Sequence, residues 1–209
     1  MHPVRVIRFI TMTRSLNILT PNPALPASDV SIYTIGHGNR SLEEFLALLN
    51  EFGIRGLVDV RSLPGSRKHP HFSREHLAEA LRTSGIRYLW EGKDLGGFRK
   101  GRGDSPHTSL ESRGFRAYAD HMETEAFRAG VDRLLTLARE SPTAFFCAER
   151  LPWKCHRFLL SDFLTMQGAR VFHIVASRKL MEHHLSPPAR KQGYGLVYDL
   201  QSQKQLKFE

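Results

Sequence analysis

The chain has 209 residues, of which 41% are hydrophobic, with two cysteines and a formal net charge of +9, which suits a single domain with a packed core. No apolar run approaches the roughly 20 residues that cross a bilayer, and two cysteines are too few for a disulfide scaffold, so we expect a cytoplasmic protein without membrane contact. The positive charge favours an anionic small molecule or nucleic acid as partner, although a basic solvated surface without a specific partner explains it equally well.

The first 28 residues differ from the rest of the chain. They contain three arginines and no acidic residue, and they end in the proline-rich run TPNPALPAS. We expect residues 1–28 to form a basic, unstructured extension; a targeting segment or a later start at Met12 also explains this composition. The α/β domain then covers residues 29–209, with a core at 31–175 and a helical or extended tail at 176–209.

From Ser31 onward, short apolar runs alternate with amphipathic helical patterns. The apolar runs predict strands at 31–38, 54–66, 86–91, 143–149 and 169–175. The helical patterns predict helices at 41–53, 73–85 and 155–168, and a helix or a broken pair at 115–141. Strands that are almost wholly apolar are typical of a sheet buried on both faces. Repeated strand–helix units therefore predict a single α/β domain with a mainly parallel sheet of about five strands and helices on both faces.

Ionisable residues follow the predicted strands. The four stretches in question are GHGNR (36–40), DVRSLPGSRKHPHF (59–72), EGKDLGGFRKGRG (91–103) and CAERLPWKCHR (147–157). Ligands of open parallel sheets bind beyond the carboxyl ends of the strands. We therefore expect a basic pocket at this edge, although any such sheet has polar loops there.

Four motifs together resemble the DUF488 family, a set of mostly bacterial proteins without a defined reaction. They are TIGHGNRSLEEF, LVDVRSLPGSRKHPHF, IRYLWEGKDLGG and FFCAERLPWKCHR, and they extend over about 31–175. Gly38 stands where the family pattern has a serine. The resemblance implies an α/β fold with a shared site, and it implies no reaction.

The segment Cys155-His156-Arg157 precedes a helical apolar period. Free N–H groups at a helix N-terminus, together with neighbouring cationic side chains, lower the pKa of a thiol and also bind anions. We therefore interpret Cys155 as a candidate catalytic thiolate and Arg157 as an anion ligand. The alternative is a first-turn cysteine packed on the sheet beside a structural arginine.

Two carboxylates, Asp59 and Glu149, are further catalytic candidates, as an acid/base pair or as anchors for arginines. Cys147 ends the apolar run TAFF, so we expect a buried, inert thiol there. The remaining candidates are anion- or substrate-binding residues: His37, Arg61, Arg67, Phe72, Gly96, Gly97 and His156.

Known enzyme templates match poorly. A phosphatase loop needs an arginine six residues after its cysteine, and Trp153 and Ser161 occupy those positions. A sulfurtransferase loop needs small residues that AERLPWK lacks. The spacing C-x7-C-H matches no tight zinc pattern, so we predict no metal ligand and leave the cofactor open.

The leading hypothesis is an enzyme acting on an anionic, phosphate-bearing substrate. Two alternatives remain: a non-catalytic nucleic-acid or nucleotide-binding module, suggested by the basic loops with Phe72 and Phe98, and a metal-dependent enzyme using Cys and His ligands.

Overall fold

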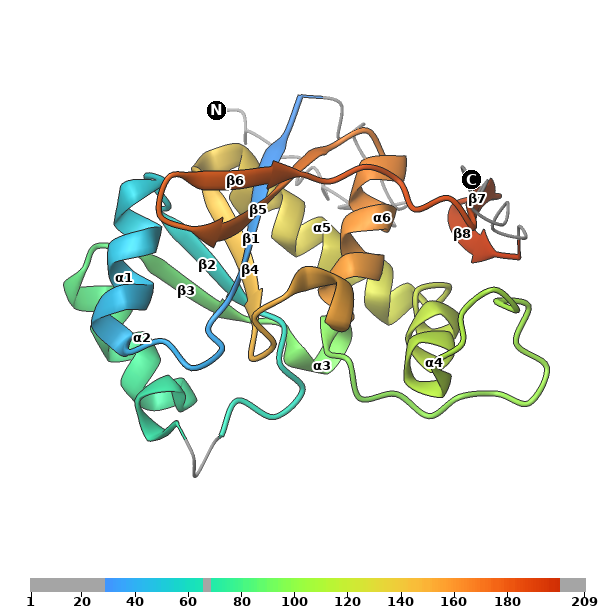
Figure 1. Cartoon of the computed structure of the whole chain (residues 1–209), viewed down its shortest axis with the longest axis horizontal. Coiled ribbons are helices and arrows are strands. Elements are labelled where there is room, and N and C mark those ends of the chain that lie inside the picture. Colours follow the sequence, from blue (N-terminus) through green and yellow to red (C-terminus); the bar gives the residue numbers. More distant parts are fainter. Residues whose placement is uncertain (1–28, 66–68, 200–209) are drawn as a thin grey trace, which may run out of the picture.

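A computed structural model describes residues 29–65 and 69–199. Its main sheet has six strands in the order β3-β2-β4-β1-β5-β6 (Figure 1). The five strands from β3 to β5 are parallel, and β6 is antiparallel to β5. The strands are β1 (Ser31–Gly36), β2 (Gly56–Asp59), β3 (Arg87–Trp90), β4 (Thr143–Cys147), β5 (Arg170–Ala176) and β6 (Lys179–Glu182). The predicted α/β fold with a mainly parallel sheet is confirmed, with one antiparallel strand more than expected.

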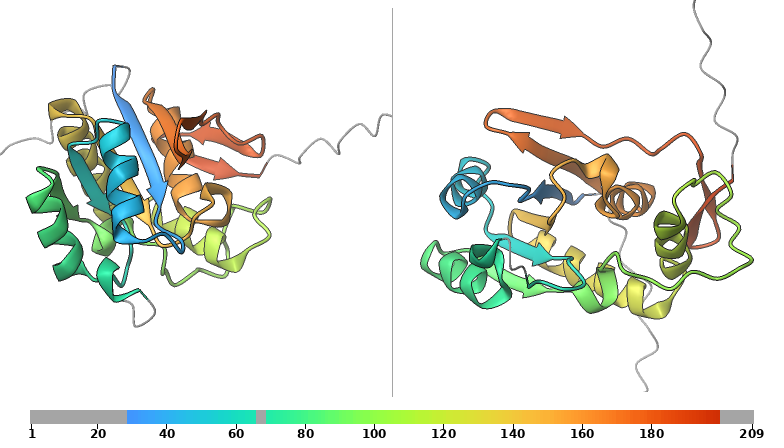
Figure 2. Two further views of the ribbon diagram at one scale, coloured as in Figure 1. Left: turned by 60° about the vertical axis from the view of Figure 1, so that its left-hand side comes forward. Right: turned by 60° about the horizontal axis from the view of Figure 1, so that its bottom comes forward.

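Helices cover both faces of this sheet (Figure 2). On one face lie α1 (Leu42–Glu51), α2 (Arg74–Thr83) and the short 3-10 helix η1 (Pro70–Phe72). On the other lie α4 (Arg113–His121), α5 (Glu125–Glu140) and α6 (Arg157–Met166). Two short elements, α3 (Gly92–Leu95) and the 3-10 helix η2 (Pro152–Lys154), lie in loops at the carboxyl edge of the sheet. None of the helices in the described parts of the chain is long and apolar enough to cross a membrane.

Alternation along the strands builds the two cores. In β4, Phe146 packs with Phe45 of α1 on one face, and Phe145 packs with the α5 and α6 side chains on the other. This is the period-2 arrangement of a strand that is buried on both sides. Both cores end at the carboxyl edge of the sheet, where the loops carry polar residues.

Local signals placed most helix ends correctly. Ser41 and Glu44 form the predicted capping box of α1. The predicted pattern at 115–141 proves to be two helices, because the chain turns between His121 and Glu125. The described part of the tail contains β6 and the hairpin β7 (Ala189–Gln192) and β8 (Gly195–Tyr198), and no helix. The expected extension at 1–28 lies outside the described residues.

Candidate functional site

Tight backbone packing joins the ends of β1 and β4. The amide of His37 donates to the Cys147 carbonyl at 3.1 Å, and the amide of Gly38 donates to the Ala148 carbonyl at 2.9 Å. A Cβ at Gly36 would lie 1.9 Å from the Glu149 carbonyl oxygen, so only glycine fits there. The loop after β4 is thereby fixed over the sheet edge.

A pocket of about 140 Å³ opens at this edge, beside the ends of β2 and β4. Its wall combines two site candidates, Arg61 and His156, with Cys147 and the apolar side chains of Leu63 and Phe98. Leu63 is 72% exposed and Phe98 is 77% exposed. The pocket is lined by Arg61, Ser62, Leu63, Gly97, Phe98, Cys147, Ala148 and His156. We refer to it as the thiol pocket.

Both thiols and one imidazole meet behind this pocket. The two sulfur atoms of Cys147 and Cys155 and a ring nitrogen of His156 all lie within 4.8 Å of one another. His156 Nε2 lies 3.1 Å from the Val60 carbonyl oxygen, which can only accept, so Nε2 carries a proton. In the neutral ring, the lone pair of Nδ1 then faces Cys155 Sγ at 3.5 Å. The imidazole is therefore held in the tautomer that accepts a proton from a thiol.

The two thiols have opposite pKa shifts. The hydrogen bond from the Cys147 thiol lowers the pKa of Cys155 well below its ordinary value, although burial raises it. His156 and Arg157 also lower the pKa of Cys155. The pKa of Cys147 is raised, because its proton is held in that hydrogen bond and because the group is largely buried beside the Cys155 charge. Cys155 is therefore the more acidic thiol of the pair, and His156 Nδ1 lies where it can take the Cys155 proton.

The exposure of the two thiols is the reverse of our expectation. Cys147, expected to be an inert core residue, is half-buried and lines the pocket. Cys155 is only 4% exposed. It lies just before α6, as predicted, but the η2 turn folds it beneath the pocket wall.

Arg157 is a buried cation without a direct carboxylate partner among the described residues. Its side chain is 1% exposed and donates to the hydroxyl of Thr34 and to the carbonyls of Glu149 and Arg150. Its Nε has no hydrogen-bond partner in the described parts of the chain. A buried charge of this kind is costly unless an opposite charge lies near, and the Cys155 thiolate supplies one. These contacts are those of a structural arginine and do not support the expected anion-binding role.

A chain of buried hydrogen bonds connects Arg157 to Asp162. Thr34 Oγ1 lies 3.3 Å from His173 Nδ1, His173 Nε2 lies 3.0 Å from His183 Nδ1, and His183 Nε2 lies 3.0 Å from Asp162 Oδ1. Since a guanidinium only donates and a carboxylate only accepts, every proton in the chain is directed from Arg157 toward Asp162. Burial lowers the pKa of His173 to about 3, so this ring is neutral. The chain was not foreseen in the sequence.

Asp59 and Arg61 form a closed pair. The Asp59 carboxylate is fully buried and accepts from Arg61 Nε at 2.9 Å, from Arg61 NH2 at 2.6 Å and from the Tyr88 hydroxyl at 2.7 Å. A further guanidinium nitrogen of Arg61 donates to the Phe72 carbonyl. Asp59 does not line the thiol pocket. This geometry is that of an anchor, the alternative considered for Asp59, and it leaves Arg61 few donors for an anion.

His37 and Glu149 face a second pocket, on the other side of the 148–150 loop. His37 stacks on Phe72 with ring centroids 4.2 Å apart. Burial lowers the pKa of His37 to about 4, so the imidazole is neutral near pH 7 and cannot bind an anion as a cation. The candidates therefore do not share the one basic pocket expected at this edge: Arg61 and His156 line the first pocket, His37 and Glu149 line the second, and Arg157 lines neither.

Two glycines position the remaining candidates. A Cβ at Gly97 would lie 2.6 Å from His156 Nδ1, and one at Gly96 would lie 2.3 Å from Ser62 Oγ. These glycines allow the loop after α3 to pack directly on the site. Arg67 lies outside the described residues. Sequence reasoning missed Leu63, which had no signal beyond its place after β2.

The family model described as "Domain of unknown function DUF488" matches residues 41–164, which are more than half of the chain. No curated protein and no solved structure matched the chain.

Proposed function

Since the chain belongs to the DUF488 family, whose function is unknown, we propose a reaction from the site itself: the protein is an enzyme that uses the thiol pair Cys147 and Cys155. The observation that carries this proposal is the cluster of both sulfur atoms and His156 within 4.8 Å behind an open pocket. A buried cation, Arg157, lies beside it. A core that only needed packing would not require a thiolate, a fixed imidazole tautomer and an opening to solvent in one place.

The exposures divide the roles between the thiols. Cys147 meets the substrate because it lines the pocket, and Cys155 receives the proton because its thiolate is hydrogen-bonded to Cys147. As Cys147 sulfur bonds to an electrophilic carbon of the substrate, its proton passes to Cys155, and the leaving group departs with the electrons of the broken bond. His156, which holds the original Cys155 proton on Nδ1, gives that proton to the leaving group.

The pocket wall restricts the substrate. Leu63, Phe98 and Ala148 present apolar surface, and the donors of Arg61 are largely occupied by Asp59. The reacting part of the substrate is therefore planar or apolar. If the substrate carries a phosphate, that phosphate binds outside the thiol pocket. The hypothesis of an anionic substrate therefore applies only to a part of the substrate away from the reacting atoms.

A second candidate is a zinc enzyme with Cys147, Cys155 and His156 as ligands. A zinc ligand histidine commonly donates its other nitrogen to a carbonyl, as His156 does to Val60. In tetrahedral zinc geometry a sulfur and a nitrogen donor are about 3.6 Å apart; here Cys155 Sγ and His156 Nδ1 are 3.5 Å apart, and all three donor atoms lie within 4.8 Å of one another. Three protein ligands with a fourth position facing a pocket are typical of catalytic zinc.

Two measurements on the purified full chain decide between these candidates. The thiol enzyme should contain no bound zinc and should show a thiolate ultraviolet absorbance whose pH midpoint lies below the ordinary value of about 8.5. Cys155→Ala should abolish that low-midpoint absorbance, and iodoacetamide should label the pocket-lining Cys147 only at alkaline pH, because its pKa is raised.

The zinc enzyme should instead contain one equivalent of metal, which Cys147→Ala, Cys155→Ala and His156→Ala each remove. A metal-free protein with ordinary midpoints for both thiols would contradict both candidates.

A further inference from the structure

A separate groove of about 500 Å³ lies between the 99–105 loop and α4. Four arginines line it and no carboxylate does; the full lining is Arg99, Gly101, Arg102, Gly103, Ser105, Arg113, Gly114, Arg116 and Ala117. The loop approaches α4 closely at Gly101, where a Cβ would lie 3.4 Å from the Ala117 Cβ. We call this feature the arginine groove.

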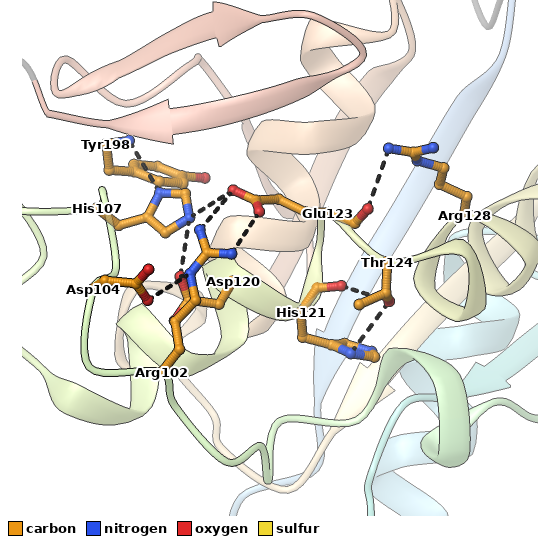
Figure 3. A network of polar contacts seen from close by, with 9 residues as sticks. All are labelled: Arg102, Asp104, His107, Asp120, His121, Glu123, Thr124, Arg128 and Tyr198. Atoms are coloured by element: carbon orange, nitrogen blue, oxygen red, sulfur yellow. Dashed lines mark hydrogen bonds and ion pairs between the residues drawn. The ribbon is translucent and has the colours of Figure 1, made fainter.

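A network of ion pairs fixes the wall of the groove (Figure 3). Arg102 lies 3.2 Å from the Asp120 carboxylate and 3.1 Å from the Glu123 carboxylate, and it pairs more weakly with Asp104. The buried His107 accepts a hydrogen bond from the Tyr198 amide and faces the carboxylates of Asp120 and Glu123 (Figure 3). Three carboxylates therefore neutralise Arg102 and hold the loop against α4.

The other cations in and beside the groove are not neutralised in this way. Arg99 donates to the backbone carbonyls of Lys93 and Gly96, and Arg116 donates to the Leu110 carbonyl. Such contacts orient a guanidinium without cancelling its charge. The side chains of Arg113 and Lys100 are exposed and form no hydrogen bond or ion pair with any residue that the structure describes. Three arginines of the lining thus keep their charge, with Lys100 beside them, although the three carboxylates around Arg102 exceed its charge by about two.

This spacing suits a chain of phosphates better than a single one. A single phosphate is held by donors that converge on one point, whereas these cations come from two segments that line an open groove, the 99–105 loop and α4. The loop begins next to Phe98, which is 77% exposed and lines the thiol pocket. An exposed aromatic beside a cationic groove is the arrangement that stacks an unpaired base while the backbone follows the charges.

We propose that the arginine groove binds the phosphate backbone of a single-stranded nucleic acid, with one base stacked on Phe98. Stacking on Phe98 needs a base that is not paired, which favours a single strand over a duplex. This binding does not depend on the thiol chemistry, since none of the groove residues belongs to the thiol cluster. A bound strand would present the base beside Phe98 to the thiol pocket.

Fluorescence anisotropy with a labelled oligothymidylate of about 20 nucleotides tests this proposal on the full chain. We expect binding that weakens with salt, and the steepness of this salt dependence should decrease by about 0.7 for each phosphate that a variant no longer binds. The double variant R113Q/R116Q should bind at least about tenfold more weakly with a shallower slope. Phe98→Ala should bind about tenfold more weakly with the slope unchanged.

The matched control is R55Q/R82Q, which removes the same charge from exposed positions outside the groove. Equal losses in this variant would overturn the proposal, because net charge alone would then explain the binding. No binding at low salt, or tighter binding of a duplex of equal length, would also overturn it. Cys155→Ala should bind the oligothymidylate with wild-type affinity, so a failure of the thiol chemistry can be told apart from a failure of strand binding. A weaker affinity of Cys155→Ala for the oligothymidylate would place the strand in the thiol pocket instead.

Discussion

Replacing Gly97 with alanine tests whether His156 tunes the thiol pair. The added Cβ would lie 2.6 Å from His156 Nδ1 and 2.9 Å from Cγ, so the ring or the loop must move by roughly 0.8 Å to restore an ordinary contact. The ring is held by the 3.1 Å bond to Val60 and the 3.5 Å contact with Cys155. A shift of this size weakens at least one of them. Gly97→Ala therefore removes no reactive group and still disturbs the cluster.

The expected cost of this overpacking is about 1–3 kcal/mol of unfolding free energy. Because His156 helps to lower the pKa of Cys155, the thiolate midpoint should rise in this variant. Urea unfolding measures the first quantity and ultraviolet absorbance against pH measures the second. Gly103→Ala is the control, since a Cβ there has nothing within 4 Å. A destabilised Gly97→Ala protein with an unchanged midpoint would refute the role given to His156.

Other predictions concern buried polar groups. The pKa of His37 is lowered by burial from 6.5 to about 4, so the free energy of unfolding should fall by about 3 kcal/mol as the pH falls from about 6.5 toward 4. His37→Asn should remove this fall from a plot of the urea-unfolding free energy against pH. A plot that does not change would exclude a lowered pKa for His37. Arg157→Gln should lower the unfolding free energy by about 2–4 kcal/mol, because buried carbonyls lose their donor; a cost below about 1 kcal/mol would show that water replaces the guanidinium. Asp162→Ala should leave the His183, Ser186 and Tyr198 donors unpaired, so limited proteolysis should cut within 183–198 sooner than in the wild type, and equal cutting rates would show that the tail is held by other contacts.

Local patterns in the sequence determined the elements of this fold. Apolar runs buried on both faces predicted the parallel strands, and the Ser41–Glu44 capping box predicted the start of α1, because both depend on residues within a few positions of one another. The strand ends also indicated the edge that carries the site. The family resemblance is likewise a property of the sequence, and the family model matches residues 41–164.

The bonding of the polar residues was decided by the tertiary structure. Arg61 is occupied because Asp59 and the Phe72 carbonyl lie beside it, and Arg157 is occupied because the loop after β4 folds over it. The sequence carries no local signal for these distant contacts. The strand order places β4 between β2 and β1, and the loop after β4 separates two pockets where the sequence predicted one. The same packing leaves Cys147 half-buried at the thiol pocket and buries Cys155, because burial depends on which segments cover a residue and not on its neighbours along the chain.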